Sequence, residues 1–208
     1  QGGAAFKRII KIIDKKNEVT EIEASPKLII KNSDIDFENV NFKYDTTHNQ
    51  AIKNINLKIQ GNTMTAFVGH SGAGKSTILN LLPRFYDPQK GNIKIDKQDI
   101  KKVSLNSLRK NISMVSQDII LFDDTIKNNI AYAKNNATQE EIEQACKFAA
   151  ADEFIIKLKD SYDTVIGENG IRLSGGQKQR LSIARAILKE SPIISVSYTH
   201  LTLPTIRL

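Results

Sequence analysis

The chain has 208 residues, 40% of them hydrophobic and 25% charged, which fits a soluble globular protein with one sizeable domain. No run reaches the roughly 18 consecutive apolar residues of a membrane-spanning helix, so we expect any spanning part of the protein to lie outside these residues. The net charge of +7 is compatible with nucleic-acid binding, but the lysines are dispersed and favour a solvated basic surface with no nucleic-acid partner.

An amphipathic helix is predicted for residues 5–16, with lysines on its polar face. Its apolar residues follow the spacing i, i+3, i+4 and i+7: Phe6, Ile9, Ile10 and Ile13. The segment from there to residue 33 lacks this period and contains Pro26, so we interpret it as a linker to the domain proper.

The period of the apolar residues changes to two in the next part of the chain. Alternation in 35–42, with one irregularity, and in 55–59 predicts strand material of an antiparallel sheet. Gly61-Asn62 marks a turn. Met64 to Val68 form a mostly apolar run that ends at Gly69, so we predict a short buried strand there.

Helices and strands alternate beyond Gly69, as in a parallel α/β core. We expect a helix from about Lys75 and strands near 93–95 and at 112–115. The segment between Ser116 and Gly170 is mostly helical in pattern.

Three local signals mark the helices that follow. Thr138 and Glu141 form a capping box that begins one helix. A last helix is expected from Ser174 to about Lys189, followed by a strand beginning at Ile193. The single cysteine, Cys146, excludes an intrachain disulfide and is expected to be a small core residue of a helix.

A phosphate-binding motif connects the predicted 64–68 strand to the helix after it. Gly69-His70-Ser71-Gly72-Ala73-Gly74-Lys75-Ser76 matches the pattern G-x-x-x-x-G-K-S/T. Glycines let backbone N–H groups turn toward a polyphosphate, and the positive end of the following helix favours the anion. Lys75 would reach the outer phosphates and Ser76 would bind Mg²⁺, with Thr77 beside them, whereas His70 is expected to face solvent. A glycine-rich turn without a ligand is the alternative.

A second candidate anion site begins the last predicted helix. In Leu173-Ser174-Gly175-Gly176-Gln177, Ser174 is a natural N-cap and Gln177 stands at the third helical position, a capping-box arrangement. Gly175 and Gly176 expose backbone donors beside the cap. Alone, this segment is equally well explained as an ordinary helix cap.

Together, the phosphate loop and the 173–177 motif resemble the ATP-binding domain of ABC transporters. The resemblance implies a P-loop NTPase (RecA-like) α/β core with an antiparallel β subdomain and an inserted helical subdomain at about 118–172, incomplete at the C-terminus. It implies ATP and Mg²⁺ as cofactors. It also implies a head-to-tail dimer, expected to be a homodimer, in which each ATP lies between the phosphate loop of one domain and Ser174–Gln177 of the other.

Other segments resemble the same family. Tyr44, in Asn41-Phe42-Lys43-Tyr44, resembles the aromatic residue that stacks on adenine, although a plain strand-end tyrosine is the alternative. Gln117 resembles the glutamine that senses Mg²⁺ and the attacking water, which makes it a metal-site residue with Ser76. Three segments, at 84–88, 123–130 and 167–170, resemble those of exporter-type ABC domains. The resemblance includes the bacterial lipid A and multidrug exporters.

The chain departs from the family pattern after Ile194. The family continues with an Asp that holds Mg²⁺ and a Glu that orients the attacking water, whereas no acidic residue follows Glu190 here. Residues 195–208 resemble the translation of a DNA-sequencing adapter, so we expect them to be a tail that is not native to the protein. We therefore expect no catalytic residue and negligible hydrolysis in this polypeptide.

The resemblance favours an ATP-driven exporter whose membrane domain precedes residue 1. Residues 1–33 would be a linker and the end of the helix that leaves the last transmembrane segment. Residues 34–194 would be the ATP-binding domain, at the cytoplasmic face of the inner or plasma membrane. Within it, 167–170 would contact the membrane domain. A lipid or another amphipathic substrate is implied, but the sequence does not identify it. A non-transport ABC ATPase and an ATP-binding module without hydrolysis are the alternatives.

Overall fold

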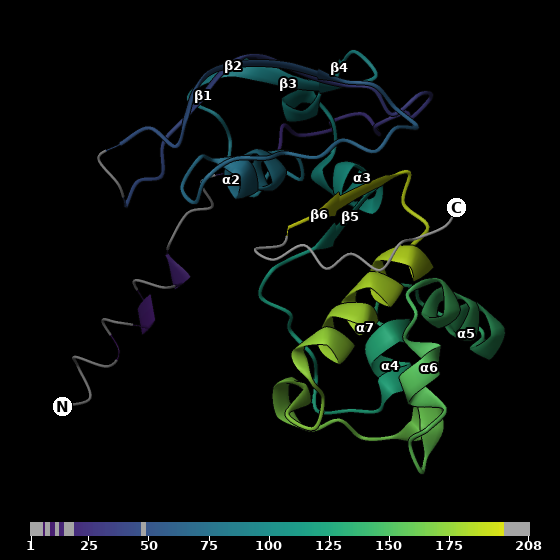
Figure 1. Cartoon of the computed structure of the whole chain (residues 1–208). Helices are drawn as coiled ribbons and strands as arrows, with labels where there is room; N and C mark the ends of the chain where they lie inside the picture. Colours follow the sequence, from purple (N-terminus) through teal and green to yellow (C-terminus); the bar gives the residue numbers. More distant parts are fainter. Residues whose placement is uncertain (1–5, 7–8, 11–12, 15–18, 47–48, 198–208) are drawn as a thin grey trace. The chain divides into compact units, whose positions relative to one another are not determined.

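The structure is a computed structural model that describes residues 6, 9–10, 13–14, 19–46 and 49–197 (Figure 1). The chain divides into two compact units, residues 1–105 and 106–208, and each is described by itself. The described apolar positions of the predicted 5–16 helix are helical, and its other positions lie partly outside the described residues. In the part of the chain that the structure describes, no helix has the length and apolar character needed to cross a bilayer.

A four-stranded antiparallel sheet forms the first unit, with strand order β2-β1-β3-β4 (Figure 1). Its strands are β1 Ile35–Phe42, β2 Ile52–Ile59, β3 Lys90–Ile95 and β4 Gln98–Asp99. Register shifts on either side of Val40 produce the predicted irregularity of β1. The strands predicted at 35–42 and 55–59 are therefore confirmed, and alternate residues of β1 point into the core.

The strand predicted near residues 93–95 exists, but its predicted place in a parallel core is wrong. β3 pairs with β1 in antiparallel register, Ile93 opposite Phe37 and Ile95 opposite Ile35. Ile93 and Ile95 are buried while Lys94 between them is not, which is the alternation of an antiparallel sheet with one solvated face.

The buried strand predicted at Met64–Val68 is also wrong. This segment is irregular, and Met64 and Val68 are 88% and 91% exposed. A strand buried on both faces needs a hydrogen-bonded neighbour on each side, and no described strand pairs with this segment. The helix predicted after it is confirmed as α2, Lys75–Leu81, and a 3₁₀ turn follows β4 at Ile100–Lys102.

The second unit contains a pair of parallel strands, β5 Ile112–Val115 and β6 Ile193–Val196 (Figure 1). Both strands were predicted from the sequence. Pairing continues to the end of β6, where Ser195 lies opposite Met114 and Val196 opposite Val115. Helix α3, Leu105–Lys110, lies at the division between the units.

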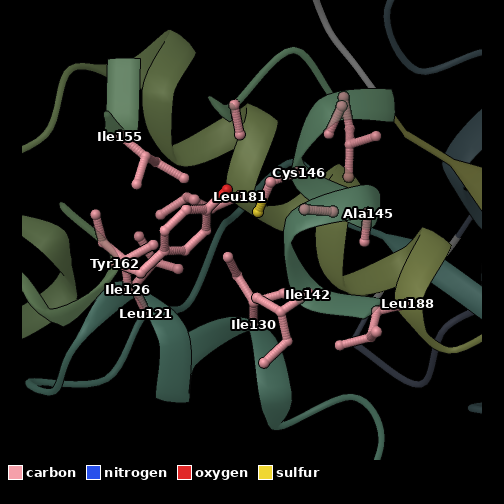
Figure 2. Close-up of a cluster of buried hydrophobic side chains, with 14 of the residues drawn as sticks. Leu121, Ile126, Ile130, Ile142, Ala145, Cys146, Ile155, Tyr162, Leu181 and Leu188 are labelled. Atoms are coloured by element: carbon pink, nitrogen blue, oxygen red, sulfur yellow. The ribbon is translucent and has the colours of Figure 1, made fainter. Parts of the chain in front are cut away.

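Helices make up the rest of the second unit: α4 Ile126–Ala131, α5 Gln139–Phe148, α6 Asp152–Ile155 and α7 Gly175–Leu188, with 3₁₀ turns at Ser161–Asp163 and Glu168–Gly170. Both predicted capping boxes are present, at Thr138 of α5 and Ser174 of α7. Helices α4, α5 and α7 pack around a shared apolar cluster, which Figure 2 shows in close-up. Cys146 is fully buried there, as predicted, and this burial raises the pKa of its thiol to about 12.

Candidate functional site

Two glycines of the phosphate motif are required by its backbone. The 69–74 segment forms a turn that enters α2, and Gly72 and Gly74 have φ angles of +80° and +84°. Gly74 is also enclosed, because a Cβ atom there would lie 2.6 Å from the carbonyl oxygen of Ala51 and 2.9 Å from Cδ1 of Ile52. A side chain at Gly74 would therefore strain the loop and displace its neighbour.

The Lys75 ammonium group lies against this same turn. It donates hydrogen bonds of 2.8 Å to the carbonyl oxygens of both Gly69 and His70. The Ala73 N–H group closes the turn by donating to the His70 carbonyl at 3.2 Å. The His70 ring is exposed, with Nδ1 2.7 Å from the Ser71 carbonyl oxygen. The loop thus places a lysine charge beside a compact, solvent-accessible backbone turn.

Tyr44 lies next to the helix that follows the loop. Its hydroxyl group donates to Oγ1 of Thr77 at 3.2 Å, and Thr77 is buried one turn into α2. The neighbouring Ser76 is exposed. The first unit therefore brings together Tyr44 and the predicted phosphate-binding residues 69–77.

The other predicted site residues lie in the second unit. At the start of α7 the Ser174 Oγ accepts a hydrogen bond from the Gln177 backbone N–H at 3.3 Å, and the Gln177 side chain accepts one from the Ser174 N–H at 2.8 Å. Gly175 and Gly176 are exposed, and an added Cβ at either would meet nothing within 4 Å. The fold of this chain does not require glycine there, unlike at Gly74. Gln117 is exposed just beyond the end of β5.

Sequence reasoning missed a buried charge in the first unit. Arg84 is 2% exposed, and two of its nitrogens donate to the two carboxylate oxygens of Asp87 at 2.9 and 2.8 Å. It also donates to the backbone carbonyls of Thr20 and Ile100 at 3.2 and 3.3 Å. The spacing of an arginine and an aspartate around two aromatic residues was the signal available in the sequence.

A second group that sequence reasoning missed supports helix α7. Asn129 of α4 is fully buried and accepts hydrogen bonds from the Phe122 N–H at 2.9 Å and from the Arg185 guanidinium at 2.7 Å. Arg185 of α7 also donates to the carbonyls of Asn129 and Ile120, each at 2.5 Å. Burial lowers the pKa of Arg185. This network ties the segment after Gln117 to the helix that begins at Ser174.

No cluster of three or more His, Cys, Asp or Glu side chains suited to a metal ion occurs among the residues that the structure describes.

Comparison with known proteins identifies the relatives of this architecture. The family model described as ABC transporter matches residues 52–196. A protein of Syntrophus aciditrophicus (strain SB), named ATP-dependent lipid A-core flippase, is 45% identical over 205 residues, which cover 99% of this chain and 34% of the relative. The protein of that name from Escherichia coli (strain K12) is 46% identical over 197 residues, covering 93% of this chain and 33% of the relative.

A solved structure described as a bacterial Atm1-family ABC exporter with ATP bound is also similar. It superposes with a TM-score of 0.91 at 41% sequence identity, over 99% of this chain and 36% of that one. The predicted fold class, a P-loop NTPase with an antiparallel sheet, is confirmed by this match. The chain spans about a third of the length of these relatives.

Proposed function

Because the chain belongs to the ABC transporter family, we propose that it is the ATP-binding domain of an exporter that moves a lipid or another amphipathic molecule across a membrane. The observation that carries the proposal is the phosphate loop, whose Gly74 has no room for a side chain and whose Lys75 ammonium lies against the turn. The proposed transport of a lipid or amphipathic molecule rests on the relatives at 45% and 46% identity, which are named ATP-dependent lipid A-core flippase.

ATP would be held mainly by residues 69–77. Backbone N–H groups of an exposed, glycine-rich turn can approach a polyphosphate closely, and the Lys75 ammonium is near enough to the turn to transfer its hydrogen bonds from carbonyl oxygens to phosphate oxygens. Ser76 is the residue of the first unit that we assign to Mg²⁺, which neutralises phosphate charge when bound. Tyr44 would stack on the adenine ring.

We assign the start of α7 to the ATP of a second, identical domain. Ser174 and Gln177 complete the helix cap within the chain. Gly175 and Gly176 leave the surface beside the cap free of side chains, although a Cβ at either position would meet nothing within 4 Å. A helix start stripped of side chains lets an anion approach its N–H donors. The proposed assembly is therefore a head-to-tail homodimer, with 167–170 facing a membrane domain at the cytoplasmic side.

Hydrolysis is a property we propose for the exporter as a whole. The chain contains no Asp or Glu after Glu190, so it offers no carboxylate in the family's position to orient the attacking water. We propose that the 208-residue chain binds ATP and does not split it.

Titration calorimetry with MgATP tests the binding site directly. Lys75→Ala should weaken binding at least tenfold, since a charge-assisted contact to phosphate is lost, on the order of 1.5–3 kcal/mol. The exposed Lys53 on β2 provides a matched control, because Lys53→Ala removes the same charge from the same unit. Equal affinities of the Lys75→Ala variant and the original chain would refute the site.

A further inference from the structure

Three aromatic rings pack together beside the phosphate-loop helix. Tyr44 contacts Phe42 with ring centroids 4.7 Å apart and planes at 83°, and contacts Tyr86 at 5.1 Å and 87°. Phe42 and Tyr86 are themselves 5.5 Å apart at 47°. Phe42 is 3% exposed at the end of β1, so it is a fixed part of the core. The plane of the Tyr44 ring is thereby fixed by two nearly perpendicular neighbours, neither of which stacks parallel on it.

The Tyr44 hydroxyl group fixes the same ring from its other end. It donates to Oγ1 of Thr77 at 3.2 Å, and Thr77 is buried in α2, two positions beyond Lys75. The ring proposed to stack on adenine is therefore connected directly to the helix that carries the proposed phosphate ligand. The hydrogen bond holds the hydroxyl end of the ring against α2, and the contacts with Phe42 and Tyr86 orient its plane.

Tyr86 is held in place by its own neighbours in the sequence. Arg84 and Asp87 flank it, and they form a two-point hydrogen-bonded ion pair at 2.9 and 2.8 Å with Arg84 only 2% exposed. Such fork-like pairs fix geometry as well as charge. The backbone that carries Tyr86 is therefore pinned on both sides of the residue.

We propose that Tyr86 is a positioning residue for the base of the bound nucleotide, holding Tyr44 in the plane needed for stacking. The inference rests on the proposed function, in which Tyr44 and the phosphate loop bind ATP. The ring contacts of Tyr86 are with Phe42 and Tyr44, so we place its role at the base end of the ligand. Loss of the Tyr86 ring should weaken the binding of a nucleotide and spare the binding of a bare polyphosphate.

The test compares two ligands by titration calorimetry of the full 208-residue chain: MgATP, and magnesium tripolyphosphate, which lacks base and sugar. Tyr86→Leu should lower the affinity for MgATP about five- to tenfold, the range of one lost aromatic contact, and leave tripolyphosphate affinity within about twofold. Tyr86→Phe keeps the ring and should restore MgATP affinity. Tyr132→Leu, which removes a tyrosine that is 72% exposed and contacts Phe122 in the second unit, is the control for loss of a tyrosine elsewhere.

The possible results separate the inference from the function on which it rests. If Tyr86→Leu weakens both ligands equally, or neither, Tyr86 does not position the base and the inference is overturned. If Tyr86→Phe fails to restore MgATP binding, the ring is not the relevant group and the inference is again overturned. If Lys75→Ala leaves the binding of both ligands unchanged, or the original chain binds neither, the proposed function fails first.

Discussion

Replacing Asn129 with alanine should destabilise the second unit far more than the same replacement at Asn128. Asn129 is fully buried, accepts hydrogen bonds from Phe122 and Arg185, and donates to the carbonyl oxygens of Phe122 and Thr125 at 3.0 and 2.9 Å. Asn128 is its exposed neighbour on α4, and its amide group donates one hydrogen bond to Asp124 at 2.9 Å. The two positions thus compare one residue type on one helix in two environments.

The cost follows from the partners that alanine leaves behind. The Phe122 N–H group loses the Asn129 side-chain oxygen as its acceptor. Nη2 of Arg185 loses the same oxygen, whereas its Nε and Nη1 keep the backbone carbonyls of Asn129 and Ile120. A donor left unsatisfied in this part-buried network costs about 1–3 kcal/mol, and the cavity at the fully buried Asn129 position adds to this, so we expect about 3–4 kcal/mol in the free energy of unfolding. Asn128→Ala breaks an exposed bond and should cost less than about 1 kcal/mol.

Urea unfolding followed by circular dichroism measures the difference. With a slope of about 2 kcal/mol per M, Asn129→Ala should lower the midpoint by roughly 1.5–2 M relative to the original chain. Hydrogen exchange at the Phe122 amide supplies a local readout, because that group should lose its protection in Asn129→Ala and keep it in Asn128→Ala. Similar destabilisation by the two variants would refute the claim that the Asn129 network supports the unit.

Three further changes test other parts of the chain. Gly74→Ala should abolish MgATP binding in calorimetry, because its Cβ would lie 2.6 Å from the Ala51 carbonyl oxygen at a φ of +84°, whereas Gly72→Ala, with nothing within 4 Å, should be milder. Gly175→Ala should leave the unfolding midpoint unchanged, since its Cβ meets nothing within 4 Å, yet should reduce ATP hydrolysis by a complete exporter. Asp96 is partly buried, which opposes ionisation, but the backbone N–H groups of residues 31–34 donate to its carboxylate and lower its pKa. Its contribution to stability is therefore full above the unfolded-state pKa of about 4 and is lost as pH falls through the folded value, so Asp96→Asn should destabilise the chain at pH 7 and progressively less as the pH is lowered below about 4 in unfolding experiments.

Features encoded within a few neighbouring residues could be predicted from the sequence. The capping boxes at Thr138 and Ser174 need a hydroxyl group and an acidic or amide side chain three residues later, and both form as expected. The alternation in 35–42 likewise predicts β1, because one face of that strand packs on the core whatever its neighbours are. The enclosed Gly74 follows from the motif that contains it.

Features that depend on distant partners could not be predicted in this way. The apolar run Met64–Val68 has the composition of a buried strand, but a strand forms only where a neighbouring strand hydrogen-bonds to it. None of the described strands pairs with this run. The direction of β3 is decided by β1, which lies far away in sequence. Asn129 is polar and sits in a helical pattern, where exposure is the ordinary expectation. Its burial becomes visible only when Arg185 and Phe122 are brought to it by the fold.

The predicted linker shows how such distant contacts change an interpretation. Gln98 both donates to and accepts from the backbone of Ile29, at 2.6 and 3.1 Å, and Asp96 receives the backbone N–H groups of 31–34. Nearer the N-terminus, Arg84 holds the Thr20 carbonyl at 3.2 Å. The linker is therefore hydrogen-bonded to the first unit at Thr20, at Ile29 and through 31–33. Arg84 thus anchors both this segment, through the Thr20 carbonyl, and the chain around Tyr86, through Asp87.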